Sequence, residues 1–197
     1  MSLSRPVTPT EWRTFLSDYS STFLNSRHLR EADEDGRAEF MVSPAQREAG
    51  WLGDEPASEE AVTAVEERFG VRLPPSYRNF LLTSNGWSCI GLIDLLRVDE
   101  IGWFLENELP ECIAPWTMAF AEYMPMLRRC LLISRDEGGS GGNWLLHADS
   151  VRADGEWTAY EWWPNDGEVP EPFESFAALA GEAVKVFAEI EEEEEEE

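Results

Sequence analysis

Two short helices with clear start and stop signals, between residues 58 and 86, restrict the fold more than any other feature of the sequence. Ser58 can cap the first helix, whose acidic first turn suits the positive end of the helix dipole. Gly70 supplies the left-handed conformation that commonly ends a helix. Pro74 and the following proline open the second helix, which Asn85-Gly86 is predicted to end. The apolar positions of the pair predict which sides are buried: Val62, Val65, Phe69, Tyr77, Phe80 and Leu81.

A further helix is predicted near the N-terminus. Thr8 can cap it, Pro9 suits its first position, and Glu11 completes a capping box. One apolar stripe follows at helical spacing: Trp12, Phe15, Leu16, Tyr19, Phe23 and Leu24. We expect this stripe to dock on the main domain, although such a stripe can also bind a partner helix.

Residues 27–44 are polar and irregular, and we interpret them as a solvated acidic loop. Glu31, Asp33, Asp35 and Gly36 imitate the start of a calcium-binding loop. Such a loop needs a bidentate carboxylate at its twelfth position, which here is Val42. The sequence therefore does not predict a calcium site, and residues 1–50 are expected to form a helix followed by this acidic loop.

The pattern changes after residue 87. Short apolar or aromatic segments bounded by Gly, Asp and Pro predict antiparallel strands at residues 90–98, 129–134, 143–147 and 157–163. A closing helix is expected over residues 175–188. The glutamate-rich residues 189–197 are predicted to be a disordered tail, because like charges repel one another. Helices, then an antiparallel sheet, then a helix indicate an α+β fold of flanking helices on a sheet, with an N-terminal helical extension.

The chain is strongly acidic. Its formal net charge is −25, and −17 remains on residues 1–188. Such a surface repels nucleic acid and anionic membranes, and it speeds the encounter with a basic partner. The simpler interpretation, in which acidity only keeps the protein soluble, stays open.

Several features favour the cytoplasm as the location of the chain. No run of eighteen apolar residues is present, and the first residues lack the apolar core of a secretion signal. Cys89, Cys112 and Cys130 are odd in number, far apart and in no CxxC pair, as is typical of reduced thiols.

A set of capping, turn and core residues carries a family resemblance: Trp51, Gly53, Ser58, Gly70, Leu73, Pro74, Tyr77, Phe80, Asn85 and Gly86. As a set it resembles the SUKH superfamily, which contains the yeast cell-wall-assembly regulator and many bacterial toxin-immunity proteins. The resemblance covers residues 51–188. It implies a compact α+β domain without a known catalytic centre. In bacteria it implies an immunity protein that blocks a cognate toxin, often a nuclease or deaminase. We interpret the matching residues as architecture, not as a partner-binding surface.

Catalytic and metal sites receive little support from the sequence. Gly138 to Gly142 match the G-x-S-x-G pattern of serine hydrolases around Ser140, but no helix is predicted after it. His28 and His147 have no partners at metal-ligand spacing. We therefore expect no catalytic residues, no metal and no cofactor, and keep a hydrolase using Ser140 as a remote alternative.

The best candidate for partner binding is the segment Trp162-Trp163-Pro164. Adjacent residues on a strand face opposite ways, so one Trp can enter the core while the other stays at the surface. A surface Trp beside Asp166 and Glu168 would be an aromatic anchor with an acidic rim. The alternative, that both Trp are buried, also stays open.

The leading hypothesis is a non-enzymatic immunity or interaction protein of the bacterial cytoplasm. It would neutralise a basic, nuclease-like toxin by covering the positive active-site cleft of that toxin. The alternative is a regulatory scaffold that binds several protein partners through its N-terminal helix. No nucleic-acid or membrane partner is expected, and the sequence leaves the oligomeric state open.

Overall fold

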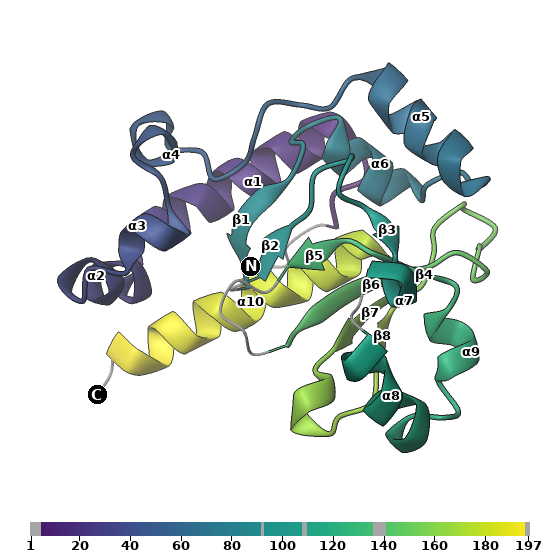
Figure 1. Cartoon of the computed structure of the whole chain (residues 1–197). Helices are drawn as coiled ribbons and strands as arrows, with labels where there is room; N and C mark the ends of the chain where they lie inside the picture. Colours follow the sequence, from purple (N-terminus) through teal and green to yellow (C-terminus); the bar gives the residue numbers. More distant parts are fainter. Residues whose placement is uncertain (1–4, 92, 108–109, 136–140, 196–197) are drawn as a thin grey trace.

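The computed structural model describes residues 5–91, 93–107, 110–135 and 141–195. The chain forms an α+β fold in which antiparallel strands are covered by helices (Figure 1). The helices are α1 (Pro9–Leu24), α2 (Arg27–Glu34), α3 (Ala38–Met41), α4 (Pro44–Ala49), α5 (Glu59–Phe69), α6 (Pro75–Leu81), α7 (Phe104–Asn107), α8 (Pro110–Ala119), α9 (Met124–Leu127), η1 (Pro164–Asp166) and α10 (Phe176–Glu195). The strands are β1 (Trp87–Ile90), β2 (Ile93–Leu95), β3 (Gly102–Trp103), β4 (Cys130–Leu132), β5 (Ser134–Arg135), β6 (Asn143–His147), β7 (Ala159–Trp162) and β8 (Glu171–Phe173).

The strands form two connected sheets. One has the order β1-β2-β5 and the other β3-β4-β6-β7-β8, and the pairings between the described strands are antiparallel. Ile133 joins them: its N–H donates to the carbonyl oxygen of Trp144, and its carbonyl accepts from the N–H of Leu96. The segment from β4 through Ile133 to β5 therefore passes from one sheet into the other, and the two sheets form one continuous layer.

The N-terminal helix docks on the main domain. The capping box of Thr8 and Glu11 is present, and the predicted stripe of α1 is buried except for the half-buried Leu24. The Trp12 ring lies 5.5 Å from that of Phe80 and 5.3 Å from that of Phe176, centroid to centroid. Helix α1 is thus part of the core and not a free arm.

The helix pair α5 and α6 begins as predicted. The Ser58 hydroxyl accepts from the N–H of Ala61, and Gly70 ends α5 with a φ of 66°. Helix α6 ends earlier than expected, at Leu81, while Asn85 turns the chain into β1 and accepts from the N–H of Val98. Its N-terminus is capped from a distance, because the buried Glu156 carboxylate accepts from both the N–H and the hydroxyl of Ser76.

The remaining motif residues have structural positions too. Leu73, Tyr77 and Phe80 are buried, and Pro74 precedes α6 as its N-cap. Gly53 pairs with Trp87 and packs closely against the turn before β1, since a Cβ on Gly53 would lie 2.0 Å from the Ser84 Oγ. Trp51 packs against Trp87, with 4.8 Å between the ring centroids. Gly86, in the turn itself, has a φ of 102°, a conformation that favours glycine.

The predicted acidic loop is wrong, since most of residues 27–44 are helical. Ser26 caps α2 and Ser43 caps α4 in a capping box with Gln46. These caps satisfy the N–H groups that a loop would leave to water. No cluster of three or more metal-binding side chains occurs within the described residues, the former calcium candidates included.

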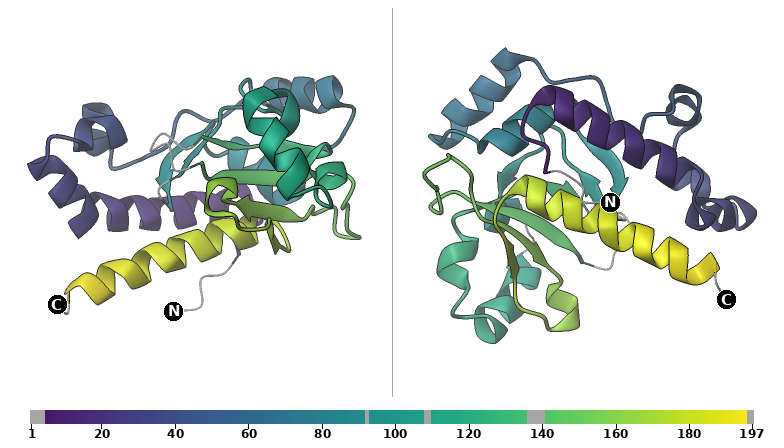
Figure 2. Two further views of the ribbon diagram at one scale, coloured as in Figure 1. Left: turned by 60° about the horizontal axis from the view of Figure 1, so that its bottom comes forward. Right: turned by 180° about the vertical axis from the view of Figure 1, so that it is seen from behind.

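The predicted disordered tail is also corrected, because α10 continues to Glu195. Lys185 forms ion pairs with Glu182 and Glu189 one turn away on either side, which supports the helix. The Glu191 carboxylate accepts the backbone N–H groups of Arg27 and His28, so it caps α2. The end of α10 and the N-terminal extension therefore contact one another, as the views in Figure 2 show.

The two faces of the sheet have separate cores. Helices α1, α6 and α10 cover the first face, where the largest cluster of buried side chains lies (Figure 2). A smaller cluster lies on the second face, under α7, α8 and α9: Phe104, Phe120, Met124, Leu127, Cys130, Leu145 and Trp162. No helix of the described part is long and apolar enough to cross a membrane.

Candidate functional site

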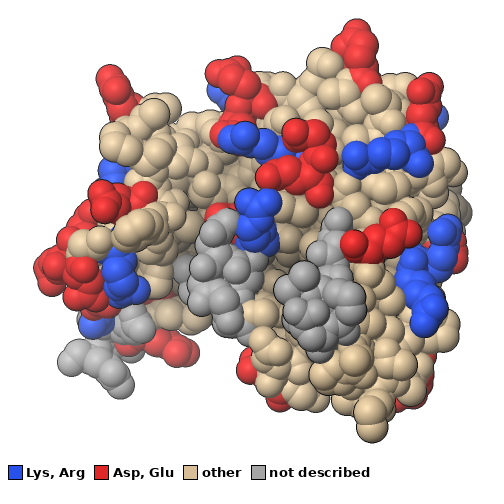
Figure 3. Space-filling view, viewed as in Figure 1, with Lys and Arg blue, Asp and Glu red and all other residues tan. Residues whose placement is uncertain are grey.

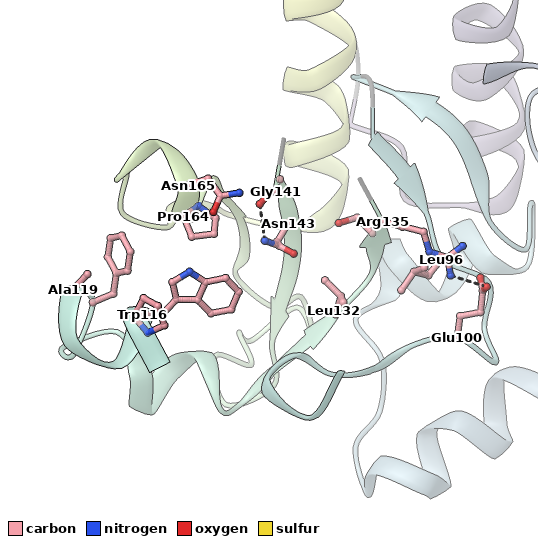
Figure 4. A pocket seen from close by; sticks show the side chains of 14 residues that line it. Leu96, Glu100, Trp116, Ala119, Leu132, Arg135, Gly141, Asn143, Pro164 and Asn165 are labelled. Atoms are coloured by element: carbon pink, nitrogen blue, oxygen red, sulfur yellow. Dashed lines mark hydrogen bonds and ion pairs between the residues drawn. The ribbon is translucent and has the colours of Figure 1, made fainter. Parts of the chain in front are cut away.

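A cleft of about 800 Å³ opens on the second face of the sheet (Figure 4). Its floor comes from Leu132 of β4, Ser134 of β5, Asn143 of β6 and Leu96, which directly follows β2. Ser134 is buried, and its hydroxyl accepts the N–H of Trp144 at 2.7 Å. The Asn143 side chain donates to the carbonyl of Gly141 at 2.9 Å. The floor is thus a fixed, mixed apolar and polar surface.

One wall of the cleft belongs to α8. Trp116 is half-buried and Phe120 is buried, and both line the opening. Their rings lie 5.2 Å from the ring of Trp162, which supports them from the sheet. The Trp162 indole N–H donates to the carbonyl of Glu168 at 2.8 Å.

The pair Trp162-Trp163 divides between the two faces. Trp162 is fully buried, so its assignment as a partner-contacting side chain is corrected: it is a core residue of the second face. Trp163 is half-buried and packs against the larger core. Its ring covers Gly142, where a Cβ would lie 2.5 Å from the indole. Asp166 and Glu168 are exposed near the cleft, which Pro164 and Asn165 line.

The opposite wall carries an ion pair. The Arg135 guanidinium lies 3.0 Å from the Glu100 carboxylate, at the other side of the opening (Figure 4). Burial raises the pKa of Glu100, but hydrogen bonds from the Arg97 N–H and from Arg135 bring this pKa below its ordinary value. Glu100 therefore carries its negative charge at neutral pH, and the pair offers both signs of charge to a bound group.

Comparison with protein-family models gives a match to the SMI1/KNR4 family (SUKH-1) over residues 56–181. The chain belongs to this family. The SUKH match contains the described strands and the cleft, while α1 to α4 and most of α10, from residue 182 onward, lie outside it. No curated protein matches the chain.

The cleft of this SUKH protein has no nucleophile and base in contact among its described residues. The Ser134 hydroxyl accepts the backbone N–H of Trp144, and the Glu100 carboxylate accepts from the Arg135 guanidinium. His147 lies at the other end of β6, opposite Cys130, and burial lowers its pKa. Ser140, the candidate nucleophile, lies outside the described residues.

Cys89 and Cys130 do not offer reactive thiols. Cys89 and Cys130 are free and buried. Burial raises the pKa of the Cys89 thiol to about 12 and that of the Cys130 thiol well above its ordinary value. Neither side chain is therefore a thiolate at neutral pH, and nucleophilic chemistry at these positions is disfavoured.

Sequence reasoning missed most of the cleft. Trp116 lies in a segment interrupted by Pro115, which hides the helical period. Glu100 and Arg135 are far apart in the chain and meet only because β5 pairs with β2. The sequence did predict the strand that begins at Asn143. It did not predict that this strand leaves one face of the sheet open.

Proposed function

We propose that this SUKH-family chain is a non-enzymatic protein-binding domain that neutralises a basic toxin by stoichiometric binding. The observation that carries the proposal is an open cleft of about 800 Å³ with fixed walls on a chain of net charge −25. A basic loop of the toxin would enter the cleft, and the acidic chain would cover the positively charged active site of that toxin. Inhibition would then follow from steric occlusion.

The distribution of charge supports a basic partner. On the face shown in Figure 3, acidic side chains gather over helix α2. Arg135 of the cleft wall is paired with Glu100. Strong net charge of one sign accelerates encounter with the opposite sign and makes it depend on salt. We propose that this encounter takes place in the cytoplasm. The free thiols Cys89 and Cys130 support this location, because reducing compartments keep thiols unpaired.

The experiment is to measure complex formation between the full chain and a basic toxin encoded next to its gene, by light scattering and calorimetry. We expect a one-to-one complex whose dissociation constant rises with salt, together with loss of toxin activity. Binding that is insensitive to salt would contradict the electrostatic part. An active toxin within a saturated complex would contradict neutralisation.

A regulatory scaffold is the second candidate, and one observation favours it. Phe40 on α3 is 82% exposed and lies outside the family match. A large exposed aromatic side chain can anchor a second partner. Deleting the N-terminal residues would remove the buried Trp12 from the core, so the better test is Phe40→Ser. A scaffold loses a partner on this substitution, whereas toxin binding at the cleft is unchanged.

A further inference from the structure

A second, smaller hollow of about 180 Å³ lies between the sheet and helix α10. Its walls are apolar: Trp163 and Phe173 come from the sheet side, and Ala183, Val186 and Ile190 come from α10. Val186 and Ile190 are 42% and 46% exposed, so the helix leaves this pocket open to solvent. Its volume is below the ~300 Å³ of the smallest typical small-molecule sites and suits one side chain.

Two carboxylates line this otherwise apolar pocket: the exposed Glu182, which forms an ion pair with Lys185, and the half-buried Glu161. Glu161 accepts the indole N–H of Trp144 at 2.9 Å and a second hydrogen bond from the Trp163 side chain. Burial raises the pKa of Glu161, and the nearby Glu171 and Glu168 raise it further. In the part of the chain that the structure describes, no Lys or Arg forms an ion pair with Glu161. Within the described residues, the Glu161 carboxylate therefore has two indole N–H donors but no cationic partner.

We propose that this pocket seats one arginine side chain of the protein partner, with the guanidinium on Glu161 and the aliphatic stem against Phe173 and Val186. Aromatic walls and a carboxylate together match a planar, weakly hydrated cation better than the compact ammonium of lysine. The inference rests on the proposed function, because it takes the partner to be basic.

Other occupants fit the pocket less well. A hard metal ion needs several oxygen ligands, and no cluster of three or more metal-binding side chains is found among the residues that the structure describes. A purely apolar side chain would bury the Glu161 carboxylate further without pairing its charge, which costs free energy. An arginine both fills the pocket and pairs this charge.

The pocket and the cleft lie on either side of one segment. Trp162 supports the cleft wall from below, and its neighbour Trp163 lines the pocket. The alternation of the strand thus places the two hollows on opposite faces at the same end of β7. A partner that binds around this end of the sheet would contact both the pocket and the cleft.

The test uses the indole N–H signals of Trp144 and Trp163, since both donate to Glu161. The full chain is titrated by NMR with N-acetyl-arginine amide and, as a neutral match of the same shape, N-acetyl-citrulline amide. We expect the arginine probe to shift both signals in a saturable way and the citrulline probe to leave them nearly unchanged. Equal shifts from the two probes would overturn the proposal.

Three variants sharpen the titration. Glu161→Gln should weaken the binding of the arginine probe by about tenfold or more, because a charged hydrogen-bonded pair is lost. Val186→Trp covers the mouth from an exposed position and should abolish probe binding while leaving the fold intact. Glu34→Gln makes the same charge change on exposed α2 and should have no effect. If Glu161→Gln and Val186→Trp bind the probe as the wild type does, the proposal is wrong.

The same materials separate this proposal from the proposed function. A toxin that binds wild type and Glu161→Gln equally, while the arginine probe fails to bind, removes the pocket and leaves neutralisation standing. A probe that binds in the expected way, while no basic protein binds the chain, supports the pocket and removes neutralisation.

Discussion

The two faces of the sheet differ in how completely they are covered. On the first face, long helices α1 and α10 and the shorter α6 bring Trp12, Phe80 and Phe176 into one aromatic cluster. On the second face, α7, α8 and α9 are short, and they cover only the part of the sheet around Trp162. The uncovered remainder is the cleft. We therefore propose a division of labour. The closed first face stabilises the fold, apart from the small pocket beside α10, and the open second face presents the cleft to a partner.

The largest effect is expected from breaking the closed face. Trp12→Ala removes a fully buried indole from the aromatic cluster and should lower the free energy of unfolding by about 4 kcal/mol. Urea denaturation followed by circular dichroism measures it. A loss below about 1 kcal/mol would show that α1 is an accessory arm and that the closed face does not depend on it.

A smaller loss is expected at the cap that joins the first face to the β6–β7 connection. Glu156→Ala leaves the N–H and hydroxyl of Ser76 without their carboxylate and should cost about 2 kcal/mol. Glu156→Gln is the matched control, since it keeps one acceptor, and it should cost less than half as much. Equal and negligible losses for both variants would mean that water caps α6 adequately.

On the open face the matching aromatic truncation should cost less. Trp116 is half-buried, so Trp116→Ala is expected to lower the free energy of unfolding by about 1 to 2 kcal/mol, well below the loss at Trp12. The same variant should weaken toxin binding, because it removes a cleft wall. A loss of stability as large as that of Trp12→Ala would contradict the contrast between the faces.

The smallest effect on stability, with a defined sign, is expected at the pocket of α10. Burial raises the pKa of Glu161 in the folded state above its ordinary value. Its contribution to stability is therefore full at low pH and is lost as pH rises through the folded-state pKa. Glu161→Gln should be at least as stable as wild type at pH 7, and its relative stability should grow from pH 4 to pH 7. Thermal unfolding at both pH values measures it, with Glu34→Gln as the control, and an opposite trend would contradict the burial of this charge.

Local signals in the sequence predicted much of the closed face. Thr8, Ser58 and Gly70 act on backbone groups within a few residues, so their caps are visible in the sequence and are present in the structure. The caps from Glu156 and Glu191 could not be predicted, because each reaches a helix far away in the chain. In the acidic segments, charge repulsion favours loop and tail, but the serine caps, the distant Glu191 cap and helix propensity outweigh it.

The open face was much less predictable. Strand alternation predicted that Trp162 and Trp163 can face opposite ways, and they do. Alternation could not show that helices cover both faces of the sheet. Trp162 points away from the larger core, yet it is more deeply buried than Trp163 because the helices of the second face cover it. The cleft depends on where short α8 stops, and that boundary follows from tertiary packing and not from a local signal.

The central claim is that a basic protein partner binds at the cleft of the open face. The most direct measurement compares the toxin affinity of two exposed substitutions near the end of α8: Ala119→Trp, which fills the cleft, and Ala121→Trp, which lies outside its lining. We predict that Ala119→Trp weakens binding by about tenfold or more while Ala121→Trp binds as the wild type does. Equal affinities for the two variants would contradict the account.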